Sequence, residues 1–210
     1  MSLPMDVTQN CAVCGGESRQ TVLLSTNAFG YADLDTRPPE MQRSTMYWWV
    51  QECPHCGYVA RKLDATTWVS RDFLQDSPYQ TCDGKQFVSS LAQRFYRQYL
   101  IAAEKEKWDE AFSALLCAAW DCDDHADVEN AIACRKLALS VMEKLPDYSQ
   151  PERMVQRADL LRRARLFDLV VDTYHPEDYE EEILQKIIRF QIQKAKEQDT
   201  LCYTVEDVIS

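Results

Sequence analysis

The sequence predicts an α+β fold in two parts, a small β module over residues 1–76 and an all-α domain over residues 77–210. Two observations separate the parts. Paired cysteines and clusters of β-branched and aromatic residues are concentrated in the first part. Beyond residue 85, apolar residues recur at helical spacing to the end of the chain. With 46% hydrophobic residues and only five glycines, the whole chain is expected to fold.

The β module is expected to contain three short strands, at residues 22–25, 45–51 and 58–63, where β-branched and aromatic residues dominate. Segments rich in Gly, Asn and Pro separate these runs. This alternation of short strands and turns is typical of a β-ribbon.

Two copies of a Cys-x-x-Cys-Gly motif carry the chemistry of this module: Cys11 and Cys14 form one pair, and Cys53 and Cys56 form the other. Each motif brings two sulfurs within reach of one ion, so two motifs complete a tetrahedral zinc-ribbon site. Protein sulfur then fills every position, which predicts one structural Zn²⁺ per chain and no catalytic metal. Two redox dithiols are the alternative, but the helical context of a thioredoxin motif is missing.

The 38 residues between the two motifs exceed the usual spacing, so an inserted loop is expected. Its most unusual stretch, residues 27–40, contains Asp33, Asp35, Arg37 and Glu40. These charged side chains can form a polar recognition loop beside the metal. They can also hold the loop together through its own Arg–carboxylate pairs, and we favour this second interpretation.

Three successive aromatic residues, Tyr47, Trp48 and Trp49, follow the insertion. They offer a stacking surface for nucleic-acid bases. Such aromatic residues more often pack a small β module against its neighbour, so we expect them to contact the helical domain. His55, inside the second cysteine motif, is expected to face solvent and to point away from the metal.

The apolar stripes of the second part predict five main helices, at residues 87–102, 108–119, 127–145, 149–174 and 177–196. The short joint between the first two predicts antiparallel neighbours. Two capping-box patterns are present. Ser149 and Glu152 are expected to start the fourth helix, and Thr204 and Asp207 to cap a last short turn.

The joint between the first two helices carries Trp108-Asp-Glu-Ala111, which resembles the turn region of a tetratricopeptide repeat. In that repeat a bulky residue and an alanine pack the two helices together. Tyr99 departs from the pattern, because a small residue is usual there, and the proline expected after the second helix is absent. An irregular tetratricopeptide-like array is therefore expected.

The remaining cysteines and histidines give weaker signals. Cys122 and His125 have the i, i+3 spacing that places two side chains on one face of a helix, with Asp123 and Asp124 between them, which raises a second metal site that we do not favour. His175 is expected at a helix junction. The other cysteines have no partner at ligand spacing and are expected to be buried as small apolar residues: Cys82, Cys117, Cys134 and Cys202.

The two cysteine motifs, the second continuing to Tyr58, together with the helical remainder resemble a family of uncharacterised bacterial zinc-ribbon proteins. The resemblance spans most of the chain, including residues 158–164 and 199–204. It implies zinc binding, a zinc ribbon joined to a tetratricopeptide-like domain, and a bacterial cytoplasmic setting. It implies no particular activity.

Charge and targeting signals narrow the classes of function. The chain has 34 acidic and 23 basic residues, a formal net charge of −11. This charge argues against nucleic acid as the main partner, because phosphate binding depends on clustered Lys and Arg. The sequence shows no signal peptide and no run of about 18 apolar residues. A cytoplasmic protein with reduced cysteines and no membrane partner is therefore expected.

We therefore expect a zinc-binding adaptor or scaffold, whose helical array offers a groove to a protein or peptide. The alternative is a zinc-ribbon protein that associates with nucleic acid or with the translation or transcription machinery. An enzyme comes third, because no catalytic or organic-cofactor motif is present. The alternative would depend on the basic residues of the first part, which are Arg37, Arg43, Arg61, Lys62 and Arg71.

Overall fold

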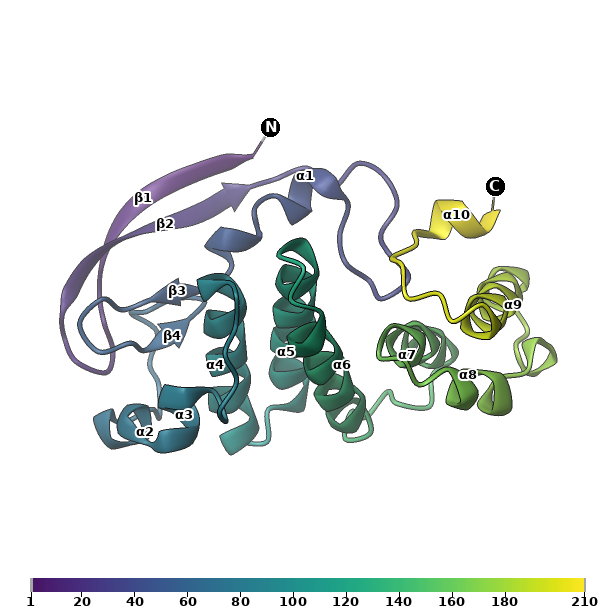
Figure 1. Cartoon of the computed structure of the whole chain (residues 1–210). Coiled ribbons are helices and arrows are strands. Elements are labelled where there is room, and N and C mark those ends of the chain that lie inside the picture. Colours follow the sequence, from purple (N-terminus) through teal and green to yellow (C-terminus); the bar gives the residue numbers. More distant parts are fainter. Residues whose placement is uncertain (1, 210) are drawn as a thin grey trace.

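The computed structural model describes residues 2–209 and has a mixed α+β architecture, with small antiparallel sheets followed by a row of helices (Figure 1). The α+β prediction is therefore confirmed. Strand β1 (Leu3–Asn10) pairs with β2 (Glu17–Ser25), and β3 (Gln51–Glu52) pairs with β4 (Val59–Ala60). Three short helices complete this part of the chain, namely α1 (Glu40–Arg43), α2 (Arg71–Gln75) and α3 (Ser77–Thr81).

The strand predicted over residues 45–51 is wrong, because its centre forms the 3₁₀ turn η1 (Met46–Trp48) and only Gln51 at its end belongs to a strand, β3. The Trp49 indole N–H donates to the Thr45 hydroxyl at 2.9 Å. A bond between side chains four positions apart fits a helical turn and not an extended strand. The aromatic run therefore forms a turn and not a strand. The side-chain bond between Trp49 and Thr45 that accompanies this turn cannot be predicted from residue type alone.

The helices of the second part lie side by side in chain order in Figure 1, with α7 between α6 and α9. The predicted stripes correspond to real helices, although the boundaries differ by a few residues. The described elements are α4 (Ser90–Glu104), α5 (Trp108–Asp124), α6 (Val128–Met142), α7 (Pro151–Arg163), α8 (Phe167–Thr173), the 3₁₀ turn η2 (Pro176–Asp178), α9 (Glu182–Lys196) and α10 (Val205–Ile209).

The same tight turn follows α4, α5 and α7. Each turn contains a non-glycine residue in the left-handed region, with φ between 53° and 60°, at Glu106, Ala126 and Arg165. The next N–H then bonds to a carbonyl five residues back, as where Asp127 donates to Cys122 at 2.8 Å. This is the Schellman arrangement, which closes a helix within one turn. The following helix can then begin at once and pack against the one before it.

The single helix predicted over residues 149–174 is wrong, because the turn at Arg165 divides it into α7 and α8. The predicted capping box of Ser149 and Glu152 is also wrong. Helix α7 begins after Gln150, and no side-chain bond caps its N-terminus. Proline at the first helical position supplies the start instead.

The capping box predicted at the C-terminal end is confirmed. The Thr204 backbone N–H donates to the Asp207 carboxylate at 2.7 Å, and the Asp207 N–H donates to the Thr204 hydroxyl at 3.4 Å. This segment also joins the insertion, since Asp33 and Thr204 form an isolated antiparallel bridge. The insertion therefore reaches across the helices to the far end of the chain.

Two large apolar clusters occupy the interior beside a small third one of Ala92, Cys122 and Ala131, and the β part contributes to both large clusters. The larger cluster combines residues of α4–α9 with four buried residues from the first part, which are Leu34, Met46, Val50 and Val59. The smaller one surrounds the cysteine motifs and consists of Cys11, Cys53, Tyr58, Leu63, Val69, Leu74 and Tyr79. The boundary near residue 76 stays a prediction about unfolding, and the packing across it is continuous.

Candidate metal centre

Each cysteine motif forms the turn of a β-hairpin, the first between β1 and β2 and the second between β3 and β4. The two turns repeat one geometry. Gly15 N–H donates to the Cys11 carbonyl at 2.8 Å, and Gly57 N–H donates to the Cys53 carbonyl at 2.9 Å. Both glycines have positive φ, 76° and 73°, which L side chains rarely adopt. The glycine of each motif therefore lets the chain curl around its own sulfurs.

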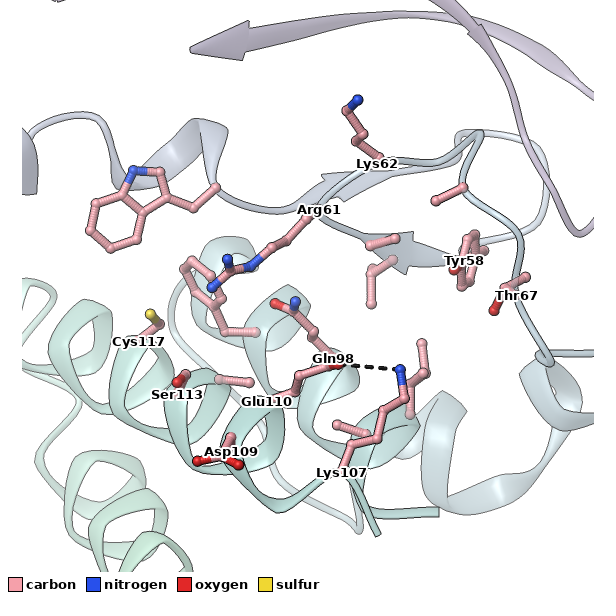
Figure 2. A pocket seen from close by; sticks show the side chains of 18 of the residues that line it. Tyr58, Arg61, Lys62, Thr67, Gln98, Lys107, Asp109, Glu110, Ser113 and Cys117 are labelled. Atoms are coloured by element: carbon pink, nitrogen blue, oxygen red, sulfur yellow. Dashed lines mark hydrogen bonds and ion pairs between the residues drawn. The ribbon is translucent and has the colours of Figure 1, made fainter. Parts of the chain in front are cut away.

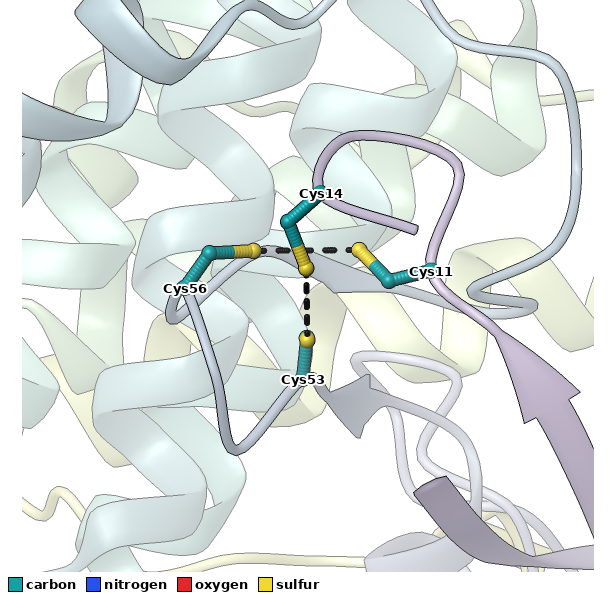
Figure 3. A group of neighbouring side chains, drawn as sticks. All are labelled: Cys11, Cys14, Cys53 and Cys56. Carbon is teal, nitrogen blue, oxygen red and sulfur yellow. Dashed lines mark hydrogen bonds between the residues drawn. The ribbon is translucent and has the colours of Figure 1, made fainter. Parts of the chain in front are cut away.

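The two turns face each other and bring all four predicted sulfurs together (Figure 3). The Cys11 and Cys56 sulfurs lie 3.7 Å apart, and the Cys14 and Cys53 sulfurs lie 3.6 Å apart. All four lie within 4.8 Å of one another. A disulfide requires about 2.05 Å, so these are four free thiols at the spacing of ligands that share one ion. The cluster is a plausible metal site.

Backbone N–H groups and burial shift the pKa values of three of the four thiols in opposite directions. The Gly16 N–H donates to Cys14 Sγ at 3.4 Å and lowers the pKa of that thiol to about 7. Burial raises the pKa of Cys53 and of Cys56. The protein by itself therefore favours the thiolate of Cys14 and disfavours those of Cys53 and Cys56. A divalent cation would supply the missing positive charge, which fits the chemistry of a thiolate donor set.

Residues outside the motifs hold the two turns in place. The Tyr79 hydroxyl of α3 donates to the Gly57 carbonyl at 2.7 Å, and the Arg71 guanidinium of α2 donates to the Cys14 carbonyl at 3.2 Å.

His55, inside the second motif, is exposed and donates a ring N–H to the Glu17 carbonyl at 2.9 Å. It therefore links the two turns on the side that faces solvent. Its predicted exposure is confirmed. The helices α2 and α3 were not predicted, because their five-residue lengths carry no periodic signal.

The charged residues of the insertion do not form an exposed recognition loop. Asp33, Asp35 and Arg37 are buried, at 3%, 0% and 4% exposure. One pair is internal to the segment, since Arg43 donates to Asp33 at 2.7 Å. Asp35 and Arg37 pair instead with Arg163 and Asp124 of the helices, so the favoured interpretation, a loop held by its own pairs, is correct only in part. Glu40 is exposed and begins α1.

Three carboxylates and three guanidinium groups meet where the insertion crosses the helices, and we call them the loop–helix ion cluster: Asp35, Asp123, Asp124, Arg37, Arg135 and Arg163. Arg163 donates to Asp35 at 2.8 Å and to Asp123 at 2.6 Å. The Trp120 indole N–H also donates to Asp35 at 2.8 Å. The cluster is balanced in charge, which offsets the cost of burying its members. Its partners lie far apart in sequence, so no local pattern revealed it.

The aromatic run is divided between two roles. Trp49 is half-buried and packs on the larger apolar cluster, as expected for a residue that joins the two parts. Tyr47 is exposed, and the Arg94 guanidinium lies 4.6 Å from its ring centroid. Of the basic residues that the nucleic-acid alternative needs, Arg37 is committed to Asp124 and Arg43 to Asp33.

The remaining cysteine and histidine predictions have mixed outcomes. Cys82 and Cys134 are fully buried as expected, whereas Cys117 is half-buried and Cys202 is exposed. Within residues 2–209 the four motif cysteines form the one group of three or more side chains close enough to share a metal. Cys122 is buried, and the His125 ring donates to the Asp121 carbonyl at 2.8 Å. His175 lies between α8 and η2, at the predicted junction.

Comparisons of the chain with family models, with curated proteins and with solved structures returned no match. The class that the fold and the site define is an α+β protein with a cluster of four cysteines that could bind a metal ion. Among residues 2–209 no helix combines the length and the apolar character needed to cross a membrane.

Proposed function

We propose that the four cysteines hold one structural Zn²⁺, and the observation that supports this most directly is the spacing of the sulfurs. Zinc binds thiolates at about 2.3 Å in a tetrahedron. A tetrahedron of that size has sulfur–sulfur edges of about 3.8 Å. The two closest pairs lie 3.7 and 3.6 Å apart, close to that edge. Cys11, Cys14, Cys53 and Cys56 fill all four positions, so the metal would serve folding and not catalysis.

Native mass spectrometry of the purified protein tests this assignment. We expect one zinc per chain, and loss of the metal when Cys11 and Cys56 are both replaced by Ser. The matched control is Cys202→Ser, because Cys202 is a free cysteine outside the cluster. Stoichiometric zinc in the double variant would overturn the ligand assignment, and zinc loss in the control would show that the assay reports general damage.

The wider role that we propose is protein interaction, as an adaptor or scaffold, and an uncovered apolar surface supports it. Met5 of β1 pairs with Val22 of β2, so these two residues share a face, and Leu3 and Leu24 lie two positions from them at the end of the ribbon, where the register shifts between Leu3 and Pro4. We call these four residues the ribbon face. Leu3, Met5 and Leu24 are 54%, 43% and 55% exposed. Apolar residues gathered on one surface mark an interaction site.

The opposite side of the same ribbon is more polar, although Pro4 and Leu23 pair there. There Arg19 and Thr21 both bond to Asp6, at 2.6 and 2.7 Å. The ribbon forms the outer edge of the molecule in Figure 1.

The repeated turns after α4, α5 and α7 support a tetratricopeptide-like description of the helical array. The nine free cysteines support a reducing compartment such as the cytoplasm.

Affinity capture with protein from the native host tests the interaction role. The wild-type chain should recover a saturable protein partner at physiological salt. Met5→Lys combined with Leu24→Lys should abolish recovery, whereas Thr8→Lys, on the polar side of the same ribbon, should leave it unchanged. Recovery that the double variant does not affect, or no saturable partner at all, would count against the proposal. Zinc content measured on the same samples keeps this result separate from the metal assignment.

A further inference from the structure

A cavity of about 570 Å³ lies between the β part and the helices, and none of its lining residues belongs to the ribbon face. One wall consists of β4 and the segment that follows it, and the other consists of α4 and the first half of α5 (Figure 2). Small side chains, including Ala102 and Ala114, leave room between the walls. A volume of this size is in the range of sites for small molecules.

Arg61 enters this cavity without a partner. Its side chain points from the end of β4 toward the helices, whereas the neighbouring Lys62 points away (Figure 2). Within the described part of the chain Arg61 has no hydrogen bond or ion pair. Its charge does reach the cavity lining. Burial raises the pKa of Cys117 to about 12, and Arg61 acts in the opposite direction. The guanidinium is therefore available to an incoming acidic group.

The other charges near the cavity are already compensated or lie apart from Arg61. Lys107 pairs with Glu110 at 3.2 Å. Asp109 lies toward the end of α5 that is farthest from Arg61 in Figure 2. In a chain with a formal net charge of −11, an uncompensated guanidinium over a cavity is a local exception. An anionic group is the chemistry that fits it, because Arg binds carboxylate, sulfonate and phosphate oxygens with two parallel bonds.

The side chains that line the cavity around Arg61 indicate which kind of molecule could carry the anionic group. Four aromatic residues line the cavity, namely Trp49, Tyr58, Trp68 and Phe95. Aromatic walls of this kind favour a flat, apolar body that can lie against their rings. The Gln98 amide and the Ser113 hydroxyl add polar groups on the helical side.

We propose that this cavity binds a small planar aromatic anion, with Arg61 pairing with the acidic group and the aromatic residues enclosing the ring system. The site is separate from the four-cysteine centre and does not depend on the proposed protein interaction. From the sequence, Arg61 was considered only as a basic residue that could contact nucleic acid. The proposal gives it a role in binding a small ligand.

Two matched dyes test the proposal on the intact zinc-loaded protein. The probe 8-anilinonaphthalene-1-sulfonate carries a sulfonate, and N-phenyl-1-naphthylamine has the same ring system without it. Fluorescence titration should show one-to-one binding of the sulfonate dye and weaker binding of the neutral dye. Arg61→Gln should weaken the sulfonate dye at least about tenfold and leave the neutral dye unchanged. Lys62→Gln removes one positive charge at the neighbouring position. It should alter the affinity for neither dye by more than about twofold.

A second variant locates the bound dye. Ser113 is exposed on α5 and lines the cavity, so Ser113→Phe should fill it and prevent both dyes from binding while circular dichroism shows a folded protein. Competition by indole-3-carboxylate and by phenyl phosphate would then assign the acidic group as carboxylate or phosphate. Equal binding of the two dyes, equal losses in Arg61→Gln and Lys62→Gln, or full binding in folded Ser113→Phe would each overturn the proposal.

Discussion

The four-cysteine centre and the loop–helix ion cluster both join segments that are distant in sequence, but they neutralise charge in opposite ways. The ion cluster is complete in itself, because Arg163 lies 2.8 Å from Asp35 and 2.6 Å from Asp123. The sulfur cluster contains only ligand atoms for a cation, and burial raises the pKa of Cys53 and of Cys56. One junction is therefore built from the protein's own charges, and the other, under the proposed zinc assignment, takes its positive charge from a bound ion.

This difference predicts which junction fails when metal is removed. Chelation should release the two hairpin turns, at a cost on the order of 10 kcal/mol for a structural site, while most helical circular dichroism survives. Limited trypsin digestion gives the sharper measurement. Arg61, which follows β4, should become rapidly cleaved, whereas Arg37, buried in the ion cluster, should stay protected.

Two outcomes would break the comparison. If Arg37 became cleaved in step with Arg61, the insertion would depend on the metal as much as the turns do. If chelation removed the helical signal together with the zinc, the molecule would unfold as one cooperative unit, and the predicted boundary near residue 76 would be wrong. The continuous packing of Leu34, Met46 and Val59 on the helices makes this a stringent test.

The second prediction breaks the other junction and leaves the metal in place. Asp35→Asn keeps the shape of the side chain but leaves Arg163 without one of its two carboxylates. Removing one partner of a buried pair typically costs about 3–5 kcal/mol, measured as the free energy of unfolding in urea. Glu110→Gln is the control, because its pair with Lys107 is exposed and should contribute little. Equal effects of the two substitutions would show that the ion cluster does not stabilise the fold.

The third prediction concerns pH. Burial acts to raise the pKa of Asp35, but Arg163 and Arg135 overcome it, so the pKa lies below its ordinary value. The unfolded chain, with an Asp pKa of about 3.9, therefore takes up the proton first as the pH falls. The stabilisation from Asp35 is fully present above that value and is lost below it.

The measurement is the difference in the free energy of unfolding between wild type and Asp35→Asn. This difference should be constant near neutral pH and should shrink below about pH 4. Both proteins lose metal in acid when the thiolates are protonated, so that effect cancels. A difference that persisted unchanged to about pH 2 would mean that the charge of Asp35 is not what stabilises the junction.

The two junctions also differ in how far the sequence reveals them. The four cysteines were predicted because ligand spacing is a local property, and the turn chemistry of Gly15 and Gly57 follows from it. The ion cluster was missed, because Asp35 and Arg163 are 128 residues apart and each is an ordinary charged residue by itself. Long-range polar contacts depend on how the helices stack, which no short pattern encodes.

The fold shows the same division. Helical stripes predicted α4, α5, α6 and α9, since each has an apolar face of many residues. Strand β1 was missed because it contains Pro and Asp and has few strong strand formers. The break between α7 and α8 was missed because Arg165 occupies the left-handed position that glycine usually marks.

The smallest expected effect concerns the two capping boxes, which look alike in sequence but differ in the structure. Thr204 and Asp207 exchange bonds, whereas no side chain caps α7 near Ser149. Thr204→Ala should therefore cost about 1 kcal/mol, while Ser149→Ala should cost almost nothing. Because Val205 N–H also donates to the Ala32 carbonyl at 3.2 Å, hydrogen exchange at that amide reports the cap locally. Faster exchange at Val205 in Thr204→Ala but not in Ser149→Ala would show that the cap, and not the sequence pattern, holds the C-terminal segment against the insertion. Equal protection in both variants would show that the backbone bonds to the insertion, such as the one from Leu34 N–H to the Tyr203 carbonyl, hold the segment without the cap.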